Sequence, residues 1–199
     1  MTESQRVKSL IYSNFTDSSS SILDWVDNYF LKSPDRFLVR PNLNGKWFGF
    51  NGGINQDVVV IEEINFLRQK IANLYNLDDF KLVRGLGDSG ACIIWLDEGE
   101  FLTVHTHNFV KDCCELRFNI LLSAPEKGGV VIVDGQTYHV EQDGMYVLDA
   151  GLPHGTDTIL KSRRVTLSFG WYVHKSFCDS ICPNRFMLKE NRLNWYNLL

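Results

Sequence analysis

Two stretches in the first 75 residues carry apolar side chains at three- and four-residue steps. Residues 22–31 include Ile22, Leu23, Trp25 and Val26, follow the serine run 18–21, and precede Pro34. In residues 58–74 the apolar positions are Ile61, Ile64, Leu67, Ile71 and Leu74. Serine is a favoured helix cap, and this spacing places the apolar residues on one helical face. The pattern predicts two amphipathic helices.

From about residue 80 the pattern changes to short β-like runs separated by turn signals. These runs are 80–83, 91–96, 101–105, 115–122, 130–133, 138–140, 145–148 and 164–173, and an earlier strand–turn–strand unit is expected in 37–50. A short closing helix is expected in 184–199. Many short strands at close spacing favour a sandwich or barrel. Helices followed by strands favour an α+β layout in which the helices brace one outer face of the β unit.

Length and composition narrow the class of protein. With 199 residues, 44% hydrophobic and 22% charged, the chain is typical of a soluble globule with a single domain, 1–199. Within it we expect N-terminal support (1–78), a β core (79–175) and a C-terminal extension (176–199). The net charge of −4, without a basic block, argues against nucleic acid as a partner. No apolar stretch is long enough for a membrane span or a signal segment, so we expect a cytoplasmic protein. The oligomeric state stays unknown.

Five cysteines make an odd number for a disulfide framework. Cys113 and Cys114 are adjacent, and Cys178 and Cys182 are four apart, so neither pair has tandem zinc-finger spacing. We predict free thiols in a reducing compartment. A structural zinc site using Cys178 and Cys182 is the alternative.

Three histidines carry the candidate chemistry. His105 and His107 are two positions apart at the end of a predicted strand, so their side chains point the same way. His154 follows after several further strands, which can fold back to the same point. Neutral imidazole binds Fe(II), Zn(II), Cu(II) and Ni(II), and three protein ligands leave positions open for a co-substrate and oxygen. We predict a mononuclear metal centre at these three residues and no other catalytic residue.

An arginine follows the third histidine. Strand alternation places Arg164, Thr166 and Ser168 on one face. A guanidinium can hold a carboxylate through two parallel hydrogen bonds, and a hydroxyl adds a third. This suits the far carboxylate of a dicarboxylate whose other end chelates the metal. Arg117 and Asn119, which share a face of the strand 115–122, are further candidates for the same pocket.

These residues resemble those of the Fe(II)- and 2-oxoglutarate-dependent oxygenases, in particular aspartyl/asparaginyl and proline hydroxylases. The likeness covers roughly residues 90–173. The segment ending in His105-Thr-His107 is similar to the family strand that ends in His-x-Asp, and 144–150 resembles the segment leading to the distal histidine, here His154. Arg164-Val-Thr166 resembles the Arg-x-Ser/Thr pair that binds 2-oxoglutarate.

The resemblance implies a fold and an activity. The fold would be a double-stranded β-helix, a jelly-roll or cupin-like barrel, braced by the N-terminal helices. The cofactors would be Fe(II) and 2-oxoglutarate, and O2 the co-substrate. The reaction would be that of a dioxygenase of the hydroxylase type: hydroxylation of an amino-acid side chain, free or in a polypeptide, with formation of succinate and CO2.

The chain departs from the family at two positions. His107 stands where the family has aspartate, and Asn119 stands where some relatives have a metal-binding histidine. Asp112 or Glu115 is an alternative source of the missing carboxylate. The segments 99–107 and 150–155 also resemble the two metal motifs of cupins, which include three-histidine dioxygenases that do not use 2-oxoglutarate. An inward-facing Arg164 discriminates against that reading. A catalytically inactive barrel that serves as a binding module is a third possibility.

Among the predicted features, the substrate is the one that the sequence indicates least. The nearest relatives imply a small-molecule or peptide substrate, and we expect Trp95, Asn108 and Trp171 to contact it. Further aromatic residues that could line a pocket mouth are Trp47, Phe48, Phe109 and Tyr172.

Overall fold

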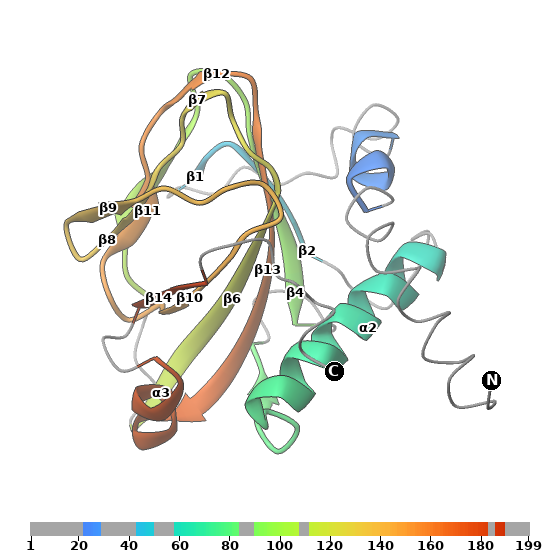
Figure 1. The fold of residues 1–199 in the computed structure, drawn as a ribbon, viewed down its shortest axis with the longest axis vertical. Helices are drawn as coiled ribbons and strands as arrows, with labels where there is room; N and C mark the ends of the chain where they lie inside the picture. The colour runs from blue at the N-terminus through green and yellow to red at the C-terminus, as the bar shows by residue number, and fades with distance from the viewer. Residues whose placement is uncertain are drawn as a thin grey trace.

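The computed structural model describes residues 22–28, 43–49, 58–83, 90–107, 112–182 and 186–189. Most of its strands belong to two sheets that enclose a common interior, and the helices lie outside them (Figure 1). Among the helices it describes, none has the length and apolar character needed to cross a membrane.

The larger sheet has seven strands. Its order is β14 (Phe186–Lys189), β10 (Met145–Asp149), β6 (Cys113–Ser123), β13 (Arg164–His174), β4 (Ala91–Leu96) and β2 (Lys46–Gly49), and β3 (Lys81–Leu82) also pairs with β13. The two longest strands, β6 and β13, are antiparallel neighbours, with Ser168 opposite Asn119 and Gly170 opposite Arg117. This pairing fixes which residues share a face across the middle of the sheet.

The smaller sheet has five strands. Its order is β1 (Leu43–Asn44), β5 (Phe101–His105), β11 (His154–Thr156), β8 (Val131–Val133) and β9 (Gln136–Tyr138). A separate pair, β12 (Ile159–Lys161) with β7 (Lys127–Gly128), lies at one end of the barrel in Figure 1. Neighbouring strands such as β5 and β11 are far apart in sequence and antiparallel. This arrangement confirms the α+β, double-stranded β-helix prediction.

Side-chain alternation on the larger sheet separates two environments. Val165, Leu167 and Phe169 of β13 are fully buried in the main apolar cluster. That cluster also contains Ile22 and Val26 from the helix over residues 22–28, and Ile64, Leu67 and Ile71 from α2 (Val58–Tyr75). The helix-covered face is therefore apolar, and the intervening residues Arg164, Thr166 and Ser168 face the barrel interior. The predicted bracing of one outer face by helices agrees with this packing.

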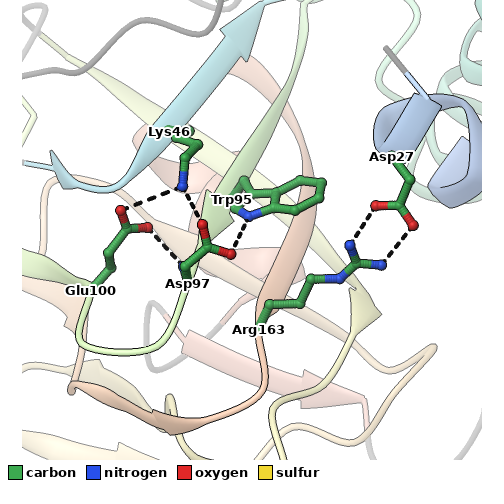
Figure 2. A network of polar contacts seen from close by, with 6 residues as sticks. All are labelled: Asp27, Lys46, Trp95, Asp97, Glu100 and Arg163. Carbon is green, nitrogen blue, oxygen red and sulfur yellow. Dashed lines mark hydrogen bonds and ion pairs between the residues drawn. The ribbon is translucent and has the colours of Figure 1, made fainter. Parts of the chain in front are cut away.

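Polar contacts on the outside tie the early segments to the barrel (Figure 2). Arg163 donates to both carboxylate oxygens of Asp27, at 2.5 and 2.7 Å, and its guanidinium lies 4.6 Å from the Trp95 ring centre. Lys46 of β2 forms an ion pair with Asp97, which also accepts a 2.7 Å hydrogen bond from Trp95 Nε1. These contacts join the helix over 22–28 and β2 to the end of β4.

Several elements differ from the sequence prediction. Residues 186–189 form β14 against β10 instead of part of a closing helix, and 190–199 lie outside the described residues. Strand β14 satisfies backbone groups along β10, a non-local pairing that periodicity does not reveal. The helix α3 (Lys175–Ile181) and the short strands β7, β11 and β12 were not predicted. Strand β9 begins two residues earlier than expected because it directly follows the turn at Asp134-Gly135.

Candidate metal centre

The three predicted histidines come from two adjacent strands. His154, the first residue of β11, is the direct register partner of His105 at the end of β5. Gly155 allows the two strands to approach closely, because a Cβ there would lie 2.5 Å from the carbonyl oxygen of Leu102. His107 lies two residues beyond β5, and its backbone N–H donates to the Ala150 carbonyl at 2.9 Å. The smaller sheet and one backbone contact therefore bring the three rings together.

The rings converge on one point. Their centroids lie 4.5 Å apart for His105 and His154, 5.1 Å for His107 and His154, and 5.2 Å for His105 and His107. One ring nitrogen from each lies within 4.8 Å of the others. His154 is buried, whereas His105 and His107 are half-buried. The group has the size of a three-ligand metal site.

For each ring, the contact made by Nδ1 determines which ring nitrogen is left to bind a metal. The Nδ1 atoms of His105 and His154 each lie 2.8 Å from a backbone carbonyl, Thr103 and Leu152 respectively. The Nδ1 of His107 lies 2.8 Å from Glu115 Oε1. Carbonyl and carboxylate oxygens only accept, so each Nδ1 carries the proton and donates it. The Nε2 atom of each neutral ring then presents its lone pair toward the common centre, as in metal-bound histidines.

The arrangement of the three rings favours a bound cation over an empty site. The Nε2 atoms of His105 and His107 face each other at 3.2 Å, and both carry lone pairs in the neutral rings. Burial, with the neighbouring His107 and Arg117, lowers the pKa of His105, although the hydrogen bond to Thr103 opposes this. Burial lowers the pKa of His154 to about 3. Protons are thus disfavoured on His105 and His154, where a divalent ion would accept the ring lone pairs.

Glu115 supports His107 rather than replacing it as a ligand. Its carboxylate accepts from His107 Nδ1 and from Arg117 Nε and forms an ion pair with that arginine. Burial alone would raise the pKa of Glu115, but the hydrogen bond from His107 and the charge of Arg117 lower it to about 2. The exposed Asp112 does not belong to the group of metal-ligating residues either. Within the described chain, the group at this centre consists of the three histidines.

Arg164 lies in the barrel interior with an incomplete set of partners. Its side chain is 1% exposed. It donates from one terminal nitrogen to Thr166 Oγ1 at 2.7 Å and from the other to Tyr146 Oη at 3.5 Å. Its Nε has no hydrogen-bond partner among the described residues. A buried guanidinium with an unused donor is costly unless an anion binds beside it, so the residues present fit a carboxylate.

Other predicted pocket residues fall near Arg164 or near the histidines. Asn119 and Ser168 are buried and directly opposite each other, and Asn119 is also opposite Tyr146 on β10. Tyr146 packs with Val131 and Val133 of β8, and Val133 is the register partner of His154. This contact links the two sheets across the interior. Arg117, predicted to bind the co-substrate, is instead engaged by Glu115.

Sequence reasoning missed two residues of this site. Tyr146, whose pKa is raised by burial against the lowering effect of Arg164, contacts the predicted anion-binding arginine. Alternation within Met145–Asp149 signals an inward residue at this position, because the neighbouring Met145 and Val147 belong to the helix-covered cluster. Glu115 was predicted only as an alternative metal ligand. Its spacing from His107 in the sequence does not indicate that the two side chains form a hydrogen bond.

The expected substrate residues need correction. Trp95 and Trp171 are 5% and 2% exposed and belong to the helix-covered cluster, where Trp171 packs edge-on against Phe118. Both side chains point to the same face of the sheet as Val165 and Leu167, so they face away from the histidines. Asn108, together with Phe109, lies outside the described residues. The half-buried Trp47 and Tyr172 instead pack with Val83 and Cys92 on the interior side of the sheet.

Comparisons with known proteins bear on the fold. No protein-family model matches the chain, and no curated protein matches it by sequence. Solved structures do match. A prolyl hydroxylase from Trichoplax adhaerens, in complex with a hypoxia inducible factor oxygen degradation domain peptide fragment, has a TM-score of 0.57 at 16% identity. The match covers 81% of this chain and 80% of that one.

Two further prolyl hydroxylases agree with it. A Pseudomonas putida prolyl-4-hydroxylase has a TM-score of 0.54 at 15% identity, covering 79% of this chain and 88% of its own. The viral collagen prolyl hydroxylase of Paramecium Bursaria Chlorella virus-1, in its 2OG complex, has a TM-score of 0.51 at 12% identity, covering 74% and 88%. The chain therefore has the double-stranded β-helix fold found in these prolyl hydroxylases.

Proposed function

We propose that the chain is an Fe(II)- and 2-oxoglutarate-dependent oxygenase that hydroxylates an amino-acid side chain, free or in a polypeptide. The observation that carries the proposal is the pairing of three converging imidazoles with a buried, incompletely partnered Arg164 in one barrel. The imidazoles alone fit many metalloenzymes. The arginine adds the chemistry of a dicarboxylate co-substrate.

His105, His107 and His154 would hold the metal through Nε2 and leave its remaining positions for 2-oxoglutarate and oxygen. Arg164, with Thr166 and Tyr146 beside it, would hold the far carboxylate of 2-oxoglutarate. When bound, the iron and 2-oxoglutarate together supply the oxidising power for hydroxylation, with succinate and CO2 as co-products. The protein contributes position: the rigid strands fix the distance between the metal ligands and the guanidinium.

The replacement of a carboxylate ligand by His107 changes the charge of the centre. A histidine carries one negative charge fewer than aspartate, which weakens attraction for a divalent ion. Glu115 compensates in part, because its ionised carboxylate accepts the Nδ1 proton of His107 and makes that ring a stronger donor. Arg117 forms an ion pair with the same carboxylate, so this compensation is partial.

The neighbours support a polypeptide substrate as one possibility within this class. The Trichoplax adhaerens enzyme is described with a peptide fragment bound, and the viral enzyme is a collagen prolyl hydroxylase. The peptide context of these proteins motivates testing proline-containing peptides together with free amino acids as substrates of this chain.

A second candidate is a three-histidine dioxygenase of the cupin type that does not use 2-oxoglutarate. The observation that favours it is the ligand set itself, in which the third ligand is His107 and no carboxylate joins the group. This alternative gives no role to Arg164. A test for 2-oxoglutarate binding therefore decides between the two candidate functions.

The test is an anaerobic titration of the Fe(II)-loaded protein with 2-oxoglutarate, followed by the visible absorption that a 2-oxo acid gives when it chelates ferrous iron. We expect saturable binding, and succinate formation once oxygen is admitted. Arg164→Ala should weaken 2-oxoglutarate binding by about 100-fold, the loss expected for a buried charge-assisted pair worth roughly 3 kcal/mol.

The matched control is Arg163→Ala. Arg163 is the adjacent arginine, but it points to the outside and pairs with Asp27. This variant should bind 2-oxoglutarate like the wild type. Absence of binding to the wild type, or equal losses in both variants, would contradict the 2-oxoglutarate assignment and favour the cupin-type alternative.

A further inference from the structure

A second cluster of metal-ligating side chains lies on the opposite side of the larger sheet from the histidines. Cys114 of β6, Asp149 of β10 and Cys178 of α3 each present a ligand atom, and these atoms lie within 4.8 Å of one another. The three residues are 4%, 0% and 0% exposed. Alternation separates this cluster from the histidine centre, since Cys114 and Asp149 follow the orientation of Leu116 and Val147 in the helix-covered layer.

The surroundings make this donor set unusual. Cys114 and Cys178 belong to the main apolar cluster, which also includes Leu116 and Val147. Asp149 places a carboxylate in the same layer, where it accepts a 2.9 Å hydrogen bond from the Gly151 backbone N–H. Taking a carboxylate out of water costs several kcal/mol, and a cation bound beside the two sulfur atoms would add to what its hydrogen bonds offset.

The donor types indicate which cation. Two sulfur atoms with one carboxylate oxygen form a soft set that suits zinc, whereas calcium and magnesium prefer oxygen donors alone. Zinc–sulfur bonds of about 2.3 Å in a tetrahedron place the sulfur atoms roughly 3.8 Å apart, so atoms already within 4.8 Å need only a small contraction. Cys182 follows Cys178 by one turn, and its backbone N–H donates to the Cys178 carbonyl at 2.8 Å. Its thiol donates to the Val147 carbonyl at 3.7 Å and is not one of the three clustered donors, so the remaining position of a tetrahedral ion is left for water.

We propose that Cys114, Asp149 and Cys178 form a second metal site that binds a zinc-type divalent ion and fastens α3 to the strands β6 and β10. The three donors come from segments that are far apart in sequence. A shared ion would therefore crosslink three elements through their side chains, in addition to the apolar packing between them.

The proposed site also lies next to the residues that hold His107 in place. Cys114 precedes Glu115, whose carboxylate accepts from His107 Nδ1, and Asp149 precedes Ala150, whose carbonyl accepts from the His107 backbone N–H. The Ala150 N–H in turn donates to the Glu115 carbonyl at 2.8 Å. An ion held by Cys114 and Asp149 fixes the spacing of the two strand ends that orient this histidine.

Cobalt substitution tests the site without any assay of turnover. The full chain is produced under reducing conditions in medium where Co(II) replaces zinc. Thiolate bound to Co(II) gives an intense near-ultraviolet charge-transfer band that histidine-bound Co(II) lacks. We expect this band in the wild type, and we expect it undiminished in His105→Ala/His154→Ala, because the histidine centre contributes no sulfur.

Two double variants form the matched pair. Cys114→Ser/Cys178→Ser should lose the band, and Cys92→Ser/Cys113→Ser, which removes two thiols outside the cluster, should retain it. Asp149→Asn, which keeps the shape of the side chain, should lower retention of Co(II) against a chelator by at least about tenfold. It serves as the deciding variant if the cysteine double variant does not fold, as judged by circular dichroism.

A wild type without the thiolate band overturns the proposal. So does a band that persists in Cys114→Ser/Cys178→Ser, a band lost equally in Cys92→Ser/Cys113→Ser, or unchanged cobalt retention in Asp149→Asn. The proposal does not rest on the oxygenase assignment, because the band and the 2-oxoglutarate titration report on different faces of the sheet.

Discussion

Along residues 164–169 of β13, the two faces of the larger sheet are buried to the same extent but carry opposite chemistry. On β13, Val165, Leu167 and Phe169 are fully buried against helices. On the other face of the same strand, Arg164, Thr166 and Ser168 are only 1–3% exposed. Burial therefore does not distinguish the two faces, and the kind of side chain does.

The difference indicates which face of the sheet stabilises the fold and which face carries the candidate site. Apolar side chains gain free energy on burial, so the helix-covered face holds the sheet together. Buried polar and charged groups cost free energy unless each finds a partner, so their concentration in the interior indicates a site for a ligand. Four predictions, from the largest effect to the smallest, test this division.

Removing an interior metal ligand should eliminate metal binding without unfolding the protein. In His154→Ala the centre loses one of three Nε2 donors, and its affinity for Fe(II) should fall by more than the roughly 100-fold seen when only an outer partner is removed. Isothermal titration measures the affinity, and circular dichroism checks the fold. The exposed His139 provides the control. A similar loss in His139→Ala would show that the histidines act non-specifically.

Adjacent residues on β13 should differ sharply in their contribution to stability. Leu167→Ala opens a cavity in the helix-covered cluster and should lower the free energy of unfolding by about 2–5 kcal/mol. Ser168→Ala on the interior face should cost about 1 kcal/mol or less. Urea denaturation measures both. Equal losses would mean that the interior face contributes to stability as much as the helix-covered face does.

The partner of His107 should affect metal affinity and leave the ligand set intact. Glu115→Gln removes the ionised acceptor of the His107 Nδ1 proton and should weaken Fe(II) binding by about 10- to 100-fold. The control, Glu126→Gln, alters a surface ion pair with Lys161 and should bind iron normally. Complete loss of iron in Glu115→Gln would instead identify Glu115 as a ligand.

The buried histidine should make the metal-free protein sensitive to acid. The pKa of His154 is about 3 in the folded protein, compared with an ordinary value of 6.5. Between these values the unfolded chain binds more protons, so the free energy of unfolding falls as the pH drops below 6.5, by up to about 1.4 kcal/mol per pH unit. Urea denaturation from pH 7 to 5 measures the slope. His154→Ala should show a shallower slope, and an unchanged slope would contradict the pKa.

Much of this site follows from strand alternation in the sequence. The two-residue spacing of His105 and His107 places their rings together, and the same rule places Arg164, Thr166 and Ser168 on one face. That rule also assigns Trp171 to the face of Val165, and the prediction of substrate contact failed because it rested on the aromatic character of the residue. The fold class follows from the density of short strands and the early helices.

The remaining features depend on contacts between distant segments. Strand β14 pairs with β10, Glu115 approaches His107, and Cys114 and Asp149 converge with Cys178 of α3. All three features arise from tertiary packing of different elements. Periodicity reports which face a residue occupies but not which residue from another strand lies beside it. The cysteine spacing predicted free thiols, with a zinc site at Cys178 and Cys182 as the alternative, and gave no indication that Cys178 lies beside Cys114 and Asp149.

The most direct test is a crystal structure of the protein grown anaerobically with Fe(II) and a non-reactive 2-oxoglutarate analogue. We expect one iron bound by the Nε2 atoms of His105, His107 and His154 at about 2.0–2.2 Å, with the far carboxylate of the analogue on Arg164. Iron bound elsewhere, or an analogue that does not touch Arg164, would contradict it.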